Sequence, residues 1–193
     1  MDILNIQKET NFKHLNLFSI QYRDRVGNKK SWVFASRQNK SSEDRAGGKP
    51  PCADAVVVVP WHREKKRLVV IREFRVPLGG YQYGFPAGLV DSKESVEAAG
   101  KRELKEETGL ELVKVLKKSP PVYSSSGMTD ESVSLLFVEC TGDFSLKGNE
   151  ESEDIEVLFF SRKDADQLLK NPEIKFDVKS WIILSSYAAH GII

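Results

Sequence analysis

Apolar and polar residues alternate in two stretches near the start of the chain. The alternating apolar residues are Phe18, Ile20 and Tyr22 before a Gly27 and Asn28 pair, and Trp32 and Phe34 after it. A period of two predicts strands with one buried face, and the Gly-Asn pair predicts the turn between them. The segment 36–51 is polar and rich in turn-forming residues. It is expected to be a mobile loop or linker.

Continuous apolar runs predict the next strands. Residues 55–59 read AVVVV, and residues 67–75 follow after the charged turn HREKK. The first run predicts a strand buried on both faces. A Pro-Leu-Gly-Gly sequence at 77–80 then breaks the chain, and further strands are predicted at 132–140 and 155–160.

Two helices are predicted near the C-terminus, over 161–170 and about 176–190. In the second helix the residues on one face are Val178, Trp181, Ile182, Ser185 and Ala189. A third, central helix is predicted within 88–110, between the two groups of strands. Strands on both sides of one central helix favour a mixed sheet with helices on both of its faces, in the α/β (α+β) class.

Composition places the chain among soluble globular proteins. It has 193 residues, with 40% hydrophobic and 30% charged residues, enough for one domain with a core. The net charge of +1 gives no electrostatic case for a nucleic-acid or membrane partner. Cys52 and Cys140 lack metal or redox spacing, and the first residues resemble no targeting peptide. No apolar run approaches the ~20 residues that cross a bilayer, so we expect a cytoplasmic protein.

The central segment GLVDSKESVEAAGKRELKEETGL carries the candidate chemistry. On a helix Glu103 and Glu107 stack on one face with Glu106 beside them. Neighbouring carboxylates can share a hard divalent cation, which prefers oxygen ligands. Glu94 and Arg102 fall on nearly the same face, so the arginine can hold a carboxylate by paired hydrogen bonds.

The rest of this segment supports a helix with a defined end. Val96, Ala99 and Leu104 form an apolar stripe for docking, and Gly109 supplies a helix stop. The alternative for such a charge run is a solvated acidic helix face. The glycines and Glu94 in register with the acidic residues favour the metal site.

The spacing from Gly88 to Leu110 resembles the signature of the Nudix hydrolases, with every specified position filled. Flanking segments are similar to the ADP-ribose pyrophosphatase branch of that family. These segments are RLVVIREFRVPLGGYQYGFPAGLVDS, SSSGMTDES and ESEDIEV, together with WVFASR. The resemblance implies an α/β/α sandwich over 51–193. It also implies that the N-terminal β unit and loop, 1–50, serve dimerisation and the substrate pocket.

The resemblance also implies which residues bind metal and activate water. The carbonyl of Ala87 and the carboxylates of Glu103 and Glu107 would bind Mg²⁺, with Mn²⁺ as a substitute, and Glu106 can help hold a further ion. Arg102 belongs to the same catalytic group. A glutamate of the late loop would position or deprotonate the attacking water. Glu151 and Glu153 both lie in that loop, and the sequence does not choose between them.

The implied substrate-binding residues are Arg75, Arg37, Trp32, Gly88 and Gly127. Arginine suits a pyrophosphate through bidentate hydrogen bonds. Arg37 could equally be a surface charge, and Trp32 could pack in a core rather than stack on adenine. Gly84 stands where an acidic residue is common in this branch, and Val33 follows Trp32 where another is frequent. These departures concern specificity rather than the metal site.

The implied activity is hydrolysis of a nucleoside diphosphate sugar by a homodimer. ADP-ribose would give AMP and ribose 5-phosphate. The alternatives are another nucleotide sugar, such as GDP-mannose, and a catalytically silent nucleotide-binding regulator. A purely structural subunit is a third possibility.

Overall fold

The computed structural model describes residues 1–38, 52–149 and 153–191. Most of the segment 36–51, predicted as a mobile loop, therefore lies outside the described residues. The chain divides into two compact units. The first combines Met1–Asp54 with Pro121–Val133, and the second combines Ala55–Pro120 with Ser134–Ile193.

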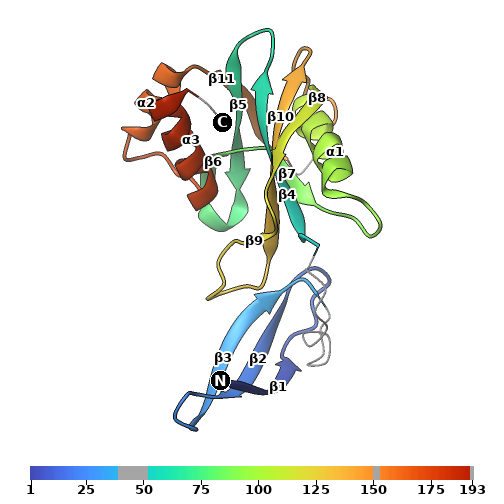
Figure 1. Ribbon diagram of the computed structural model, residues 1–193, viewed down its shortest axis with the longest axis vertical. Coiled ribbons are helices and arrows are strands. Elements are labelled where there is room, and N and C mark those ends of the chain that lie inside the picture. The colour runs from blue at the N-terminus through green and yellow to red at the C-terminus, as the bar shows by residue number, and fades with distance from the viewer. Residues whose placement is uncertain (39–51, 150–152, 192–193) are drawn as a thin grey trace. The chain divides into compact units, whose positions relative to one another are not determined.

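The first unit is built on a three-stranded antiparallel sheet of β1 (Asp2–Lys8), β2 (Asn16–Arg23) and β3 (Lys29–Ser36) (Figure 1). Phe18 lies opposite Phe34 in the register of β2 and β3, and their ring centroids are 5.5 Å apart. Both rings are buried. The two strands predicted for this region are confirmed, and the alternation buries Phe18 and Phe34, whereas Trp32 of the same pattern is half exposed.

A second segment of the chain completes the first unit. It contains β9 (Val122–Tyr123), which pairs with the first residues of β10 (Ser132–Thr141). The amide of Ala35 donates to the carbonyl of Met128 at 2.8 Å. Asp54 accepts hydrogen bonds from the amide and hydroxyl of Ser132 at 2.9 and 2.8 Å. The first contact attaches the loop between β9 and β10 to the N-terminal sheet, and the second attaches Asp54 to the first residue of β10.

The second unit is a sheet with helices on both faces, as predicted. Besides most of β10, its elements are β4 (Ala55–His62), β5 (Arg67–Arg75), β6 (Gly80–Gly84), β7 (Ala87–Leu89), α1 (Val96–Thr108), β8 (Glu111–Lys118), β11 (Ile155–Phe160), α2 (Arg162–Leu169) and α3 (Val178–His190), with a 3₁₀ turn at Val76–Leu78. The main strand order is β11-β5-β4-β10-β8, with β6 beside β5 and β7 beside β4. Helix α1 lies on one face, and α2 and α3 lie on the other (Figure 1).

The core lies on both sides of β4. Val56 and Val58 pack in one cluster with Ala99 and Leu104 of α1. The intervening valines are also buried, and alternation along the strand directs them to the other face. The prediction of a doubly buried strand is therefore confirmed.

Helix α1 begins and ends where local chemistry requires. The side chain of Ser95 accepts a hydrogen bond from the amide of Ala98, which caps the N-terminus. Gly109 adopts a left-handed φ of 74°, and its amide bonds to the carbonyl of Lys105. A residue with a Cβ is strained in that conformation, so glycine stops the helix here.

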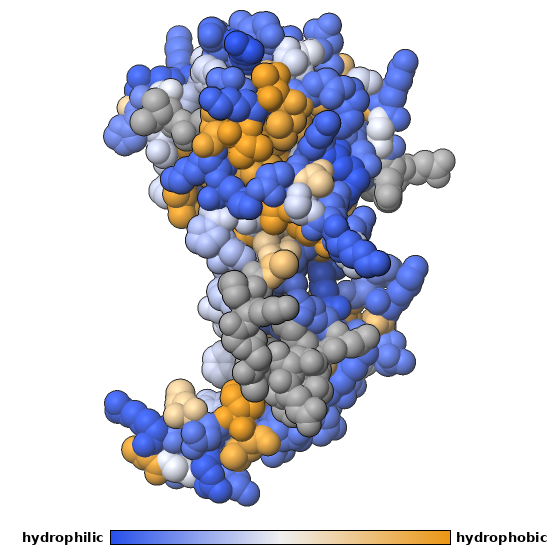
Figure 2. All heavy atoms as spheres, turned by 45° about the vertical axis from the view of Figure 1, so that its right-hand side comes forward, coloured by the Kyte–Doolittle hydropathy of each residue, from blue (hydrophilic) through white to orange (hydrophobic). Residues whose placement is uncertain are grey.

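Helix α3 presents the apolar face singled out from the sequence to solvent. Val178, Trp181 and Ile182 are exposed, whereas the helix packs through Ile183, Leu184 and Tyr187. Both faces of its central turns are apolar, so periodicity alone does not select the buried one. No helix in the described ranges is long and apolar enough to cross a membrane. Figure 2 shows polar side chains over most of the visible face, with apolar side chains gathered in patches between them.

Candidate active site

Acidic side chains of α1 line a pocket beside β7. Glu103 and Glu107 lie one turn apart and are only 8% and 6% exposed, whereas Glu106 is exposed. The pocket has a volume of about 440 Å³. Its lining residues are Ala87, Gly88, Leu89, Asp91, Arg102, Glu103, Glu106, Glu107, Gly148 and Glu153. The residues predicted as metal ligands therefore all line one pocket.

The backbone at Gly88 passes close to the carboxylate of Glu103. A Cβ added at position 88 would be 1.9 Å from Oε1 and 2.1 Å from Cδ of Glu103. The backbone of β7 and the side chain from α1 thus approach so closely that any other residue at position 88 would require the carboxylate of Glu103 to move. Glycine at this position leaves room for the carboxylate as the structure places it.

Arg102 links the carboxylates around the pocket. Its Nε and Nη2 donate to the two oxygens of Glu94 at 3.3 and 3.1 Å, which are the paired hydrogen bonds expected from the sequence. Its Nη1 donates to Glu103 at 2.6 Å and to Glu106 at 3.2 Å, and Nη2 also donates to the carbonyl of Leu89 at 3.0 Å. Hydrogen bonding to Glu94 raises the pKa of the guanidinium further above its ordinary range.

Burial disfavours the charged form of the two inner carboxylates, Glu103 and Glu107. It raises the pKa of Glu107 to about 9, with further contributions from Glu103 and Glu73, although the amide of Ala87 donates to Glu107 at 3.3 Å. Burial also raises the pKa of Glu103, and the hydrogen bond from Arg102 opposes that rise. Two buried acids one turn apart need positive charge nearby to ionise together.

These residues fit a divalent cation, although they do not form a finished cage. In the part of the chain that the structure describes, no three acidic, histidine or cysteine side chains are grouped closely enough to hold a metal ion. Arg102 draws Glu103 and Glu106 toward itself, while Glu107 points to the amide of Ala87. Hard divalent cations prefer oxygen ligands, which these carboxylates supply. A bound cation would also offset the cost of burying their negative charge.

The late loop contributes Glu153 to the pocket. Its charge raises the pKa of Glu103, Glu107 and Glu73, so it lies within electrostatic reach of all three. Glu151, the other candidate for water activation, lies outside the described residues.

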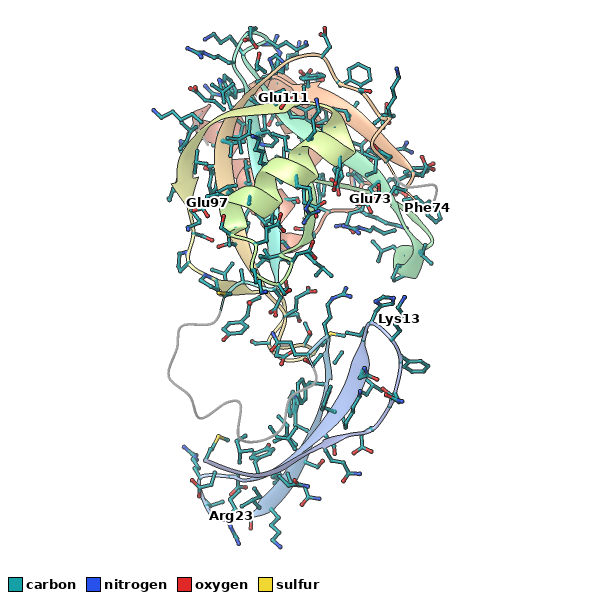
Figure 3. The ribbon with its side chains drawn as sticks, turned by 90° about the vertical axis from the view of Figure 1, so that its right-hand side faces the viewer. Lys13, Arg23, Glu73, Phe74, Glu97 and Glu111 are labelled. Atoms are coloured by element: carbon teal, nitrogen blue, oxygen red, sulfur yellow. The ribbon has the colours of Figure 1, made fainter. Side chains whose placement is uncertain are left out.

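Glu73 is a site residue that the sequence did not reveal. It lies on β5, and Figure 3 labels it together with its neighbour Phe74. Nη1 of Arg75 is 3.0 Å from Oε1 of Glu73. Burial raises the pKa of Glu73, the charge of Arg75 opposes this, and Glu153 adds to it. The sequence offered no signal beyond the alternation of charged residues at the end of this strand.

Three predicted substrate-binding residues belong to the first unit. Nε1 of Trp32 donates to the carbonyl of Gly127 at 3.1 Å, so the structure brings these two residues together. Trp32 is half exposed, which does not fit core packing within this chain. Nε of Arg37 forms an ion pair with Glu131 at 3.1 Å. The other predicted site residues within the described ranges lie in the second unit.

Comparison with known proteins gives the class to which this fold and site belong. A model of the NUDIX domain matches residues 52–182. The chain belongs to the Nudix family.

Two named relatives are similar to the chain over most of its length. An ADP-ribose pyrophosphatase of Saccharomyces cerevisiae is 32% identical over 146 residues, covering 76% of this chain and 60% of that protein. The match therefore spans less than two thirds of the yeast enzyme. A GDP-mannose pyrophosphatase of Citrobacter koseri is 31% identical over 165 residues, covering 81% of each.

A solved structure shares the fold. The crystal structure of an ADP compounds hydrolase aligns with a TM-score of 0.68 at 22% identity, covering 98% of this chain and 94% of that one. The Nudix architecture predicted from the sequence is thereby confirmed.

Proposed function

We propose that the chain hydrolyses the pyrophosphate bond of a nucleoside diphosphate sugar, with ADP-ribose giving AMP and ribose 5-phosphate. The observation that carries this proposal is the pair of buried carboxylates, Glu103 and Glu107, at a pocket shared with Gly88 and Glu153. The yeast relative, named an ADP-ribose pyrophosphatase, supports the substrate class.

Mg²⁺, with Mn²⁺ as a substitute, is the proposed cofactor. Glu103, Glu107 and the carbonyl of Ala87 would hold it, and Glu106 would help with a further ion. A bound divalent cation neutralises phosphoryl charge and lowers the pKa of a water molecule. The chain's own task is to hold these ligands in place, and the contact between Gly88 and Glu103 supports that role.

The remaining residues bind the substrate and direct the water. One of Glu151 and Glu153 accepts the proton of the attacking water. That water adds to one phosphorus atom, the bridging P–O bond breaks, and each product keeps one phosphate. Arg75 and Arg37 bind the diphosphate through their guanidinium donors. Trp32 stacks on the adenine beside Gly127.

A homodimer and a cytoplasmic location complete the proposal. Residues 1–50 would serve dimerisation and the substrate pocket, and 51–193 would form the hydrolase domain. Exposed apolar side chains on the N-terminal sheet, among them Trp32 and Val33, support an interface there. Both cysteines are free, which suits a reducing compartment. Light scattering coupled to size exclusion would measure the oligomeric state, and a monomer at micromolar concentration would contradict the dimer.

A hydrolysis screen tests the activity. ADP-ribose, GDP-mannose, diadenosine polyphosphates and oxidised nucleoside triphosphates would be incubated with Mg²⁺ or Mn²⁺, and the products identified. We expect AMP and ribose 5-phosphate from ADP-ribose, and a loss of at least ~100-fold in kcat for Glu107→Gln, a metal ligand. Glu97→Gln is the matched control, because Glu97 lies on the same helix but pairs with Lys118 outside the pocket. Binding of ADP-ribose without turnover would favour a nucleotide-binding regulator.

GDP-mannose is the second candidate substrate. The relative from Citrobacter koseri, named a GDP-mannose pyrophosphatase, supports it. Gly84 also supplies no carboxylate where the ADP-ribose branch commonly has one. A kcat/KM at least tenfold higher for GDP-mannose than for ADP-ribose would decide in favour of this alternative.

A further inference from the structure

Glu73 lies at a rigid position in the sheet. It is opposite Gln82 of β6 and opposite Ile155 of β11, so β5 is paired on both sides at this residue. Residues of equal parity along β5 share one face. Val69 of that face packs in the core cluster with α1, so Glu73 and Arg75 also face the side of the sheet that carries α1.

The pair formed by Glu73 and Arg75 is asymmetric in its exposure. The side chain of Glu73 is 17% exposed and that of Arg75 is 47% exposed, with Nη1 and Oε1 3.0 Å apart. A partly buried carboxylate is therefore fixed by the strand, and it holds the end of a longer, more exposed side chain. A buried carboxylate of this kind is costly unless it is paired.

The surroundings of Glu73 are acidic. Its charge raises the pKa of Glu107, and the charge of Glu153 raises that of Glu73. The carboxylate lies on the face of the sheet that carries α1, the helix whose acidic side chains line the pocket, and Arg75 is the cation bound to it on the same strand. The ion pair uses Nη1 of Arg75. A guanidinium has five N–H donors, so the same group can bind phosphate oxygens while this contact persists.

We propose that Glu73 is a positioning residue that holds the guanidinium of Arg75 at the edge of the acidic pocket, oriented toward the substrate's diphosphate. This inference rests on the proposed function, because it assigns Arg75 to that diphosphate. An arginine held in advance loses less conformational freedom on binding, so the ion pair improves substrate affinity without taking part in bond breaking.

A double-mutant cycle tests the inference. KM and kcat for ADP-ribose would be measured at saturating Mg²⁺ for Glu73→Gln, Arg75→Gln and the double variant. We expect each single variant to raise KM by about tenfold, as for loss of a charge-assisted hydrogen bond, with kcat within threefold of wild type. The double variant should be no worse than the worse single variant, because both substitutions remove the same contact.

Glu156→Gln is the matched control. Glu156 also lies at the β5–β11 edge and forms an ion pair with Arg72 at 3.4 Å, and its loss should leave KM unchanged. Thermal unfolding would be recorded for every variant, so that a change in KM is separated from a change in stability.

Three results would overturn the inference. The first is an unchanged KM for Glu73→Gln. The second is a KM of the double variant raised by the product of the two single-variant factors. The third is a higher Mg²⁺ concentration for half-maximal activity with unchanged KM, which would place Glu73 in the metal site. If the wild type hydrolyses none of the nucleotide sugars, the proposed function fails separately. Calorimetry with a methylene analogue of ADP-ribose then tests the positioning role. A weaker Kd for Glu73→Gln supports it, and an equal Kd or no binding to wild type overturns it.

Discussion

The hydroxyl of Tyr81 donates a hydrogen bond to the carboxylate of Asp154, the residue that directly follows Glu153. The amide of Phe74 donates to the carbonyl of the same aspartate at 3.0 Å. The guanidinium carbon of Arg72 lies 3.7 Å from the centre of the Tyr81 ring. Residues of β5 and β6 therefore hold the end of the loop that carries Glu153 into the pocket.

Tyr81→Phe is expected to lower kcat by roughly 3- to 10-fold, which corresponds to the loss of one hydrogen bond. The ring contacts remain, so KM and the melting temperature should change little. The kinetics would be repeated in a Glu153→Gln background. There the substitution should have no further effect if Tyr81 acts through Glu153, and the same factor in both backgrounds would contradict this.

Gly88→Ala is expected to displace Glu103, a proposed metal ligand, and to reduce kcat by at least ~10-fold. The added Cβ would meet the carboxylate at 1.9 Å. Gly84→Ala is the matched control, because the nearest atom to its Cβ is the hydroxyl oxygen of Ser180 at 3.7 Å. Steady-state kinetics and a melting curve would be measured for both. Equal activity of the two variants would show that the close approach at Gly88 has no functional importance.

Arg102→Lys is expected to lower kcat by about 10-fold. Lysine keeps the positive charge, but it cannot donate in parallel to both oxygens of Glu94 while also reaching Glu103. Lys105→Arg, an exposed exchange on the same helix, serves as the control and should be neutral. A fully active Arg102→Lys enzyme would mean that charge alone suffices at this position.

The metal-free protein is expected to lose stability as pH rises from about 5 to 9. The pKa of Glu107 is raised to about 9 in the folded chain from an ordinary value of 4.5. The folded state therefore binds a proton that the unfolded state releases, and this contribution is lost as pH rises through the folded-state pKa.

Thermal unfolding in EDTA across that pH range would measure this dependence. Glu107→Gln cannot ionise at this position and should give a flatter profile than wild type. Mg²⁺ should restore stability to wild type at high pH, because a cation favours the ionised carboxylate. Parallel pH profiles for the two proteins would contradict the assignment.

Much of the fold follows from local pattern. The alternation in β2 and β3, the valine run of β4 and the stop at Gly109 each have a strong periodic or conformational signal. Strands β1 and β8 were missed because most of their side chains are exposed, so no buried face leaves an apolar period. The outward face of α3 was ambiguous for the opposite reason, since apolar residues surround its central turns.

The part of the acidic pocket that lies on α1 could be predicted from helical geometry alone. One helix brings Glu103 and Glu107 together, and spacing alone shows this. Glu73 comes from a strand thirty residues earlier, and its closeness to the pocket depends on how β5 pairs with β6 and β11. The bond from Arg102 to the carbonyl of Leu89 likewise depends on tertiary packing. Contacts of this kind leave no regular spacing along the chain.

Arg102 supplies a positive charge of the chain itself to the carboxylates of Glu94, Glu103 and Glu106. The acidic side chains of this segment are crowded whether or not a metal ion is bound, and the positive charge of Arg102 reduces their mutual repulsion. Under the metal dependence proposed above, a lack of the cation would stop hydrolysis while Arg102 still pairs with these three carboxylates.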